Sequence, residues 1–321
     1  GIKPAVTAIV VQAAHRIGSR ALKNNVLWAI TAASFVAIFA LDLPFPLIVV
    51  MAAAVGYIGG RISPHTFQTG GGHSASHTSY GPALIDDHTP PPTHARFSFT
   101  GLAQVLLVGA ALWTVPMSVL YALYGWEHSY TQMAWFFTKA ALLTFGGAYA
   151  VLPYVYQGAV GHYGWVTPTQ MMEGLALGET TPGPLIMVVA FVAFIGGYVK
   201  ALLGPESLFA AGALAACLVT WFTFLPSFIF ILAGGPLVES THRNLKFTAP
   251  LTAITAAVVG VIIHLALFFG YHLLWPEGFE GALDVRSAAL ALAATLALFK
   301  LQRSVMEVIF FCALVGWVLH L

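Results

Sequence analysis

Charged residues are scarce in this chain. Its 321 residues include 13 Lys plus Arg and 12 Asp plus Glu, which is 8% of the sequence, against about 25% in a typical soluble domain. So little polar surface cannot cover a water-soluble globule, whereas lipid can solvate the excess of apolar side chains. The net charge is +1, and the chain lacks the Lys and Arg clusters that nucleic acid requires. We therefore exclude nucleic acid as a partner.

Cysteine and recognisable enzyme motifs are equally sparse. Only Cys217 and Cys312 occur, both inside apolar runs, so we interpret them as buried small hydrophobic residues and not as a disulfide or as metal ligands. Neither a His-Glu-x-x-His zinc motif nor a phosphate-binding loop is present. We therefore expect no enzyme, no metal site and no other cofactor.

Apolar sequence is abundant. Hydrophobic residues make up 59% of the chain, and the stretches 97–126, 207–238 and 247–276 contain no Asp, Glu, Lys or Arg. Each stretch exceeds the roughly 20 residues with which a helix spans a bilayer. The sequence predicts an all-α polytopic membrane protein. The apolar runs place its helices at about 2–17, 26–41, 45–60, 97–125, 131–158, 169–203, 207–234, 247–274, 286–299 and 304–320.

Two of these runs predict discontinuous helices. The run 131–158 contains the glycine pair 146–147 and Pro153, and the run 169–203 contains a Pro-Gly-Pro segment at 182–184. Glycine and proline interrupt helices. Within a membrane, unwound backbone must line a cavity or be buried against protein. We therefore expect a ligand site at these two breaks.

Composition divides the chain into three parts. Residues 62–96 are rich in Ser, Thr, Gly, Pro and His and offer almost nothing apolar to bury, which predicts a flexible polar linker between the parts 1–61 and 97–321. The linker carries five irregularly spaced histidines: His65, His73, His77, His88 and His94. Metal binding by these histidines is the basis of one alternative function, a membrane scaffold or sensor.

Short internal matches suggest a repeat on either side of the linker. Residues 53–58 resemble 313–318 and residues 4–9 resemble 250–254, in the same order. We interpret 1–61 as the C-terminal part of a first repeat and 97–321 as a complete second repeat, so that about 150 residues of the first repeat are expected upstream.

Basic residues mark opposite ends of the matching helices. In the first part, the end of the first helix and the open ends of the hairpin carry Arg16, Arg20, Lys23 and Arg61. In the second part, the start of the matching helix carries Arg243 and Lys246, and the tip of the matching hairpin carries Lys300 and Arg303. By the positive-inside rule, the two repeats insert in opposite directions and the linker 62–96 is cytoplasmic.

Three charged residues next to the predicted breaks are candidates for chemistry. Lys139 lies six residues before the glycine pair in an apolar run, where a buried ammonium needs a partner or a water-filled cavity. Glu173 and Glu179 precede the Pro-Gly-Pro segment, and a buried carboxylate there can take up a proton. The alternative for each glutamate is a structural role, as a helix cap or as an ion-pair partner of Lys139.

Small and hydroxyl residues at the breaks complete the expected site. Glycines allow the backbone to approach a ligand closely, and a half-helix beginning after them offers free N–H groups to an anion. We expect Lys139 as counter-charge and Glu179, then Glu173, as proton-coupling groups. The substrate-binding set is Lys139, Thr144, Gly146, Gly147, Thr180, Thr181 and Gly183.

The two broken segments resemble the chromate ion transporter family. The resemblance rests on Phe137-Thr138-Lys139, Thr144-Phe145-Gly146-Gly147, Leu152-Pro153, Trp165, the run 174–187 around the Pro-Gly-Pro segment, and Pro226-Ser227. It covers 97–321, and the opening residues 1–6 resemble the late part of the family's first half. Two positions depart from the pattern: Ala148 replaces a common third glycine, and Ala190 a common glutamine.

The resemblance implies a multi-pass protein of the cell inner membrane that exports chromate and confers resistance to it, with proton exchange or sulfate competition. Its expected partners are chromate, sulfate, protons and the lipid bilayer, and a homodimer stays open. Another inorganic anion, such as sulfate, is the alternative substrate. Because the first half's own Phe-Gly-Gly and Pro-Gly-Pro segments are absent, we do not expect 1–321 alone to form the whole pathway.

Overall fold

A computed structural model describes residues 1–67, 97–144, 147–181, 183–240 and 248–318, and within them every regular element is a helix. The elements are α1 (Ile2–Ala21), α2 (Asn25–Phe39), α3 (Phe45–Ile62), α4 (Pro64–Phe67), α5 (Phe99–Tyr124), α6 (Ser129–Leu142), α7 (Ala148–Tyr156), η2 (Gln157–His162), α8 (Pro168–Thr180), η3 (Leu185–Met187), α9 (Val188–Val199), η4 (Pro205–Ser207), α10 (Leu208–Ser240), α11 (Thr248–Leu274), α12 (Val285–Phe299) and α13 (Val305–Val318).

Four of these helices are long and apolar enough to cross a membrane: Phe45–Ile62, Phe99–Tyr124, Pro205–Pro236 and Thr248–Leu274. The prediction of an all-α polytopic membrane protein with discontinuous helices is confirmed. Most of the predicted linker, 68–96, lies outside the described residues. Its first residues form α4, in which Phe67 is buried against Gly59 of α3.

Side-chain caps start several helices where the sequence provides an acceptor. The Asn24 side chain accepts the N–H of Leu27 at the start of α2, and Asp284 accepts the N–H of Ser287 at the start of α12. Thr167 and Gln170 form a reciprocal capping box at the start of α8. These caps satisfy N–H groups that a helix leaves without an internal acceptor.

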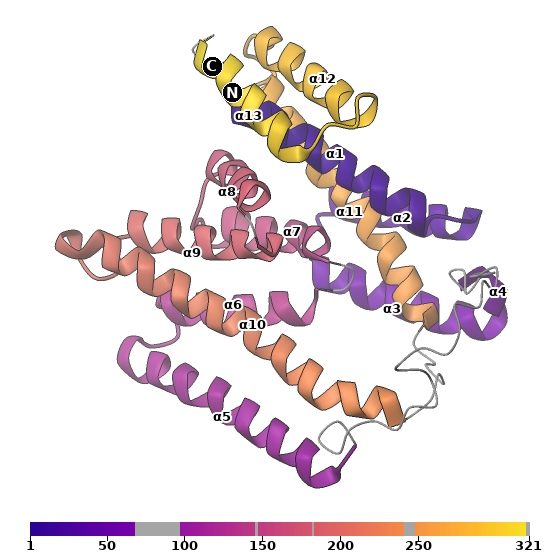
Figure 1. The fold of residues 1–321 in the computed structure, drawn as a ribbon, viewed down its shortest axis with the longest axis vertical. Coiled ribbons are helices and arrows are strands. Elements are labelled where there is room, and N and C mark those ends of the chain that lie inside the picture. The colour runs from indigo at the N-terminus through magenta and orange to yellow at the C-terminus, as the bar shows by residue number, and fades with distance from the viewer. Residues whose placement is uncertain (68–96, 145–146, 182, 241–247, 319–321) are drawn as a thin grey trace, which may run out of the picture.

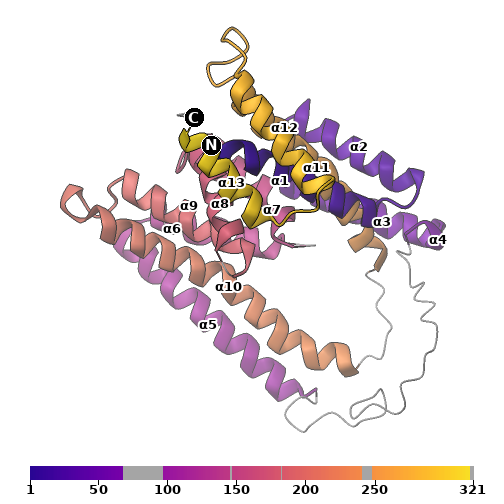
Figure 2. The same cartoon turned by 45° about the horizontal axis from the view of Figure 1, so that its top comes forward.

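Two long helices, α1 and α11, pack on each other and organise both ends of the chain (Figure 1). The hairpin α2–α3 packs on α11, and the hairpin α12–α13 packs on α1. The start of α1 therefore lies beside α13 (Figure 2), where Gly1 contacts the backbone of Gly316. The hairpin that follows α1 in the chain thus packs mainly on α11, and the hairpin that follows α11 packs mainly on α1.

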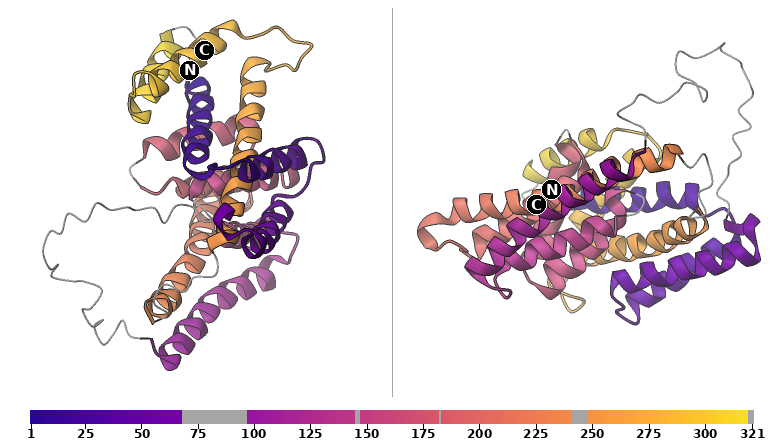
Figure 3. Two further views of the ribbon diagram at one scale, coloured as in Figure 1. Left: turned by 90° about the vertical axis from the view of Figure 1, so that its right-hand side faces the viewer. Right: turned by 90° about the horizontal axis from the view of Figure 1, so that it is seen from below.

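The remaining helices form a second group, in which α10 packs along α9, α6 and α5. Figure 3 shows α5 alongside α10 at the edge of the molecule. Only 17% of the apolar window of α5 is buried within the protein, and Phe99 and Leu107 are largely exposed. An apolar face of this size is accounted for by contact with lipid.

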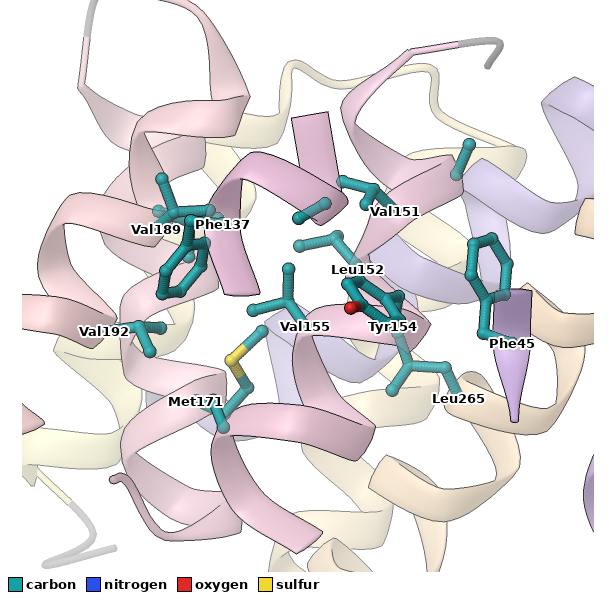
Figure 4. Close-up of a cluster of buried hydrophobic side chains, with 14 of the residues drawn as sticks. Phe45, Phe137, Val151, Leu152, Tyr154, Val155, Met171, Val189, Val192 and Leu265 are labelled. Atoms are coloured by element: carbon teal, nitrogen blue, oxygen red, sulfur yellow. The ribbon is translucent and has the colours of Figure 1, made fainter. Parts of the chain in front are cut away.

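The broken helices lie in the centre, and their buried faces make the core (Figure 4). Val151, Leu152 and Val155 of α7 are fully buried. They belong to one cluster with Met171 of α8 and Val192 of α9. The buried faces of α7 and α8 therefore fix these two helices against each other and against α9.

Gln157 fastens the first hairpin to this core. At the π-helical turn η2, its Oε1 accepts the N–H of Phe45 at 3.1 Å and its Nε2 donates to the carbonyl of Leu43 at 3.4 Å. Phe45 is fully buried, so its N–H depends on this acceptor. The amide thereby couples the α2–α3 tip to the end of α7, the second half of the first broken helix pair.

Replacing Gln157 with leucine is expected to destabilise the protein, because a buried N–H would be left without an acceptor at a cost of about 1–3 kcal/mol. Gln132→Leu is the matched control, since its amide reaches only the exposed Glu127 at 3.4 Å. Thermal unfolding of both purified variants in detergent measures the difference. Equal midpoints would show that the Gln157 contacts do not stabilise the fold.

Candidate functional site

The first break separates α6 from α7. α6 ends at Leu142 and α7 begins at Ala148, so a half-helix starts directly after the glycine pair, as the sequence predicts. Gly147 is the N-cap of α7 with φ of 105°, a conformation that side-chain-bearing residues rarely adopt. Glycine at this position is therefore explained by backbone geometry. Gly146 lies outside the described residues.

The second break separates α8 from α9. α8 ends at Thr180, and the chain resumes as the short 3-10 turn η3 before α9. Pro184 is the N-cap of this turn. Thr181 ends α8 in an extended conformation, because a proline disfavours the helical conformation in the residue before it. Pro182 lies outside the described residues.

The two breaks meet at one cavity of about 410 Å³. α10 supplies its third wall. The lining residues are Ala141, Thr144, Ala148, Tyr149, Pro184, Leu185, Ile186, Thr223, Phe224 and Ser227. Among the described residues that the sequence places in the substrate site, Thr144 is the one that lines this cavity.

A hydrogen bond ties the two broken helices together beside the cavity. The Tyr149 hydroxyl, in the first turn of α7, donates to Oε1 of Glu179, in the last turn of α8. Tyr149 also lines the cavity. Glu179 is thus joined to the cavity through the phenol. Sequence reasoning selected Glu179 but missed Tyr149, whose only signal was its position two residues after the glycine pair.

α10 brings two hydroxyl groups that sequence reasoning also missed. Thr223 and Ser227 are four residues apart in α10, so they share one helix face, and both line the cavity. Thr223 is 4% exposed, and its Oγ1 is buried with no hydrogen-bond partner. A pair of hydroxyl residues at helical spacing in a charge-free run was the signal that could have identified this face.

Lys139 lies on a different face of α6. Its Nζ is 5.7 Å from the ring centre of Trp135, and the side chain is half-buried. It is not among the residues that line the cavity. The neighbouring Thr138 hydroxyl accepts the indole N–H of Trp113 at 3.0 Å. The structure therefore places Lys139 near the break without directing it to the cavity.

The other predicted residues lie around the second break. Glu173 is exposed on α8, one turn and a half before Glu179. The Thr180 and Thr181 hydroxyls donate to carbonyls of their own helix, at Ala176 and Leu177. Gly183 is exposed. In the described parts of the chain, no three His, Cys, Asp or Glu side chains gather as a metal site.

Comparison with known proteins identifies related sequences. The sequence model of the chromate transporter family matches residues 131–317. A chromate transport protein of Pseudomonas aeruginosa is 33% identical over 264 residues, which cover 82% of this chain and 52% of that protein. A chromate transport protein of Cupriavidus metallidurans is 26% identical over 173 residues.

A probable chromate transport protein of Synechococcus elongatus is 27% identical over 173 residues. The matches to the Cupriavidus and Synechococcus proteins cover 54% of this chain and 38% of each relative. The chain thus spans about half or less of the length of these relatives. No solved structure matches it significantly.

Proposed function

Because this chain belongs to the chromate transporter family, we propose that it carries chromate outward across the cell inner membrane and confers resistance to it. The observation that carries this proposal is the cavity where two discontinuous helices meet. In membrane transporters, half-helix N-termini at such breaks are suited to anionic substrates. A tetrahedral oxyanion accepts hydrogen bonds from hydroxyl and backbone N–H groups, and both kinds of group are present here.

The glutamates of α8 are the proposed proton-coupling groups, Glu179 first and Glu173 second. Glu179 is half-buried and bonded to a cavity residue, whereas Glu173 is exposed. An ionisable group within the membrane is costly and is retained where it has a function. This difference in environment favours Glu179 as the residue whose protonation is coupled to transport.

The wider proposal concerns the arrangement of the whole transporter. Two repeats insert in opposite directions, the linker 62–96 is cytoplasmic, and sulfate competes with chromate. α1 packs on α11 and on the hairpin that follows α11, while α11 packs on the hairpin that follows α1. This reciprocal packing supports the repeat interpretation, because two equivalent repeats would contribute equivalent helices to each other. The site set also includes Gly146, Gly147, Thr180, Thr181 and Gly183, which contribute backbone and hydroxyl groups. A homodimer is compatible with the exposed apolar helices.

Lys139 is the proposed counter-charge for the dianion. We expect Lys139→Ala to abolish chromate resistance while leaving membrane insertion intact, because a buried dianion needs a counter-charge and Lys139 lies on the half-helix that ends at the first break. Lys200→Ala is the matched control, since Lys200 lies at the end of α9 and donates to the carbonyl of Tyr163 at 2.9 Å. Growth of cells on chromate measures the effect. Unchanged resistance of the Lys139 variant would remove this residue from the site.

Chromate accumulation in intact cells tests the function as a whole. Cells that express the transporter are expected to accumulate less chromate than control cells, and added sulfate is expected to change this difference. Equal accumulation despite confirmed membrane insertion would exclude chromate export. Export of sulfate in the same assay would favour the alternative, a transporter of another inorganic anion. Zinc binding by the isolated linker peptide would favour the scaffold or sensor instead.

A further inference from the structure

Hydrogen-bond donors in the cavity come mainly from neutral groups. Two hydroxyls of α10, Thr223 and Ser227, line it, and the buried Oγ1 of Thr223 has no hydrogen-bond partner in the described part of the chain. The N-terminus of α7 is at Ala148 and Tyr149, where the first N–H groups of a helix have no internal acceptor. Together they are donors that need an acceptor ligand.

Thr223 differs from several other helical threonines of the described chain, although the hydroxyl of Thr131 on α6 is likewise buried without a partner. Thr220, one turn earlier on α10, donates to the carbonyl of Ala216 at 2.8 Å. Thr114 of α5 and Thr295 of α12 bond back to their own helices in the same way. Thr223 makes no such bond, although only 4% of this residue is exposed. An unpaired buried hydroxyl is costly and is expected where a ligand completes it.

Two other hydroxyls of the cavity already use their hydrogen. Thr144 donates to the carbonyl of Ala140 at 2.7 Å, and Tyr149 donates to Glu179. Toward the cavity, both oxygens can therefore only accept a hydrogen bond. An anion would be repelled by the Tyr149 oxygen in this state. The phenol can serve the anion only if its hydrogen is released from Glu179.

We propose that Thr223, Ser227 and the first N–H groups of α7 bind a fully deprotonated tetrahedral oxyanion, and that Tyr149 joins them as a donor when Glu179 takes up one proton. The carboxylate then becomes a carboxyl group, its O–H donates to the Tyr149 oxygen, and the phenol O–H turns to the oxyanion. The proton stays on Glu179 and the phenol keeps its own hydrogen. This inference rests on the proposed function and specifies how substrate and proton are coupled.

Charges around this pair set its response to pH. Arg16 of α1 acts electrostatically on Tyr149, whereas the neighbouring His15 packs on Phe299 of α12. α9 and η3 carry no Asp, Glu, Lys, Arg or His. The other charged or histidine side chains of the elements that pack against α8 are Lys3 and Arg20 of α1, Glu307 of α13, and His264 and His272 of α11, with Glu173 on α8 itself. The elements that pack against α7 add Lys139 of α6, Arg61 of α3 and His162 of η2. One proton bound with a dianion leaves a net charge of −1, which an inside-negative membrane potential drives outward.

Calorimetric titration of the full-length protein in lipid nanodiscs with sulfate, and separately with chromate, tests this inference. Sulfate stays a dianion at every pH of the titration. A change in the affinity for sulfate with pH therefore reports protonation of the protein and not of the ligand. The wild type is expected to bind more tightly as pH falls and to take up a proton. Tyr149→Phe and Glu179→Gln are each expected to bind with an affinity that no longer depends on pH.

Thr223→Val is expected to bind about tenfold more weakly at every pH, because a donor to a charged acceptor is lost. Thr220→Val is the matched control and is expected to bind like the wild type. Ser227→Ala provides a second test at an exposed position, and this variant is expected to bind both oxyanions more weakly than the wild type at every pH.

If Thr223→Val, Ser227→Ala and Thr220→Val all bind like the wild type, and Tyr149→Phe retains the pH dependence, the inference is wrong and the proposed function stands. If the wild type binds neither oxyanion, both are wrong.

Discussion

Cells that express Glu179→Ala are expected to be as sensitive to chromate as cells without the transporter. Glu179 is the carboxylate that is joined to the cavity through Tyr149. Without it, the proposed proton-coupling group is missing from the cavity, and the phenol is expected to hold the substrate permanently. Transport then stops because binding is no longer followed by release. Growth on graded chromate, together with chromate accumulation, measures the loss.

Glu173→Ala is the control on the same helix. Glu173 is exposed, so its loss is expected to reduce resistance much less than the loss of Glu179. Immunoblots of the membrane fraction must show equal amounts of both variants. A normal level of resistance in the Glu179 variant, with sensitivity in the Glu173 variant, would reverse the assignment of the two carboxylates.

Gly260→Val is expected to prevent the stable packing of α2 on α11. A Cβ atom at Gly260 would lie 2.2 Å from the carbonyl oxygen of Thr31 and 3.0 Å from the backbone nitrogen of Phe35. Both atoms belong to backbone, so no side-chain rotation can relieve the overlap. The Thr31 hydroxyl also bonds to the carbonyl of Ala256 at 2.8 Å. Overpacking in a tight interface costs about 1–3 kcal/mol or more.

Gly270→Val, in the same helix, separates packing from helix propensity. A Cβ atom at Gly270 would meet nothing within 4 Å, so this variant carries the same change without the overlap. We expect monodisperse protein in normal amount from Gly270→Val and little or none from Gly260→Val by size-exclusion chromatography. Equal yields and equal thermal midpoints would contradict the close packing of α2 on α11.

The helices could be predicted because lipid imposes simple rules on sequence. Charge-free runs of 30 residues or more can only be helices in a bilayer, and glycine and proline mark where these helices stop. The breaks after Leu142 and Thr180 were therefore foreseeable. The meeting of both breaks at a single cavity followed from no local pattern. It depends on how α7, α8 and α10 pack, which is determined by contacts between residues far apart in the chain.

The chemistry of the site was predictable only in part. Glu179 and Thr144 were identified because they adjoin the breaks, and the structure brings both to the cavity region, Glu179 through Tyr149. Tyr149 and Thr223 were missed, since a tyrosine or threonine in an apolar helix is ordinary until its partners are known. Lys139 was selected for its charge, yet its side chain lies beside Trp135. Whether each of these side chains reaches the cavity depends on the direction in which it points from its helix. Sequence spacing alone does not specify that direction.

Chromate flux into proteoliposomes measures most directly whether an oxyanion moves through this protein. With the interior held electrically positive, liposomes containing the purified full-length transporter are expected to take up chromate faster than protein-free liposomes. Sulfate is expected to slow this uptake, and Glu179→Ala to reduce it to the protein-free rate. Equal uptake by liposomes with and without correctly inserted protein would contradict the proposal that the full-length transporter carries chromate.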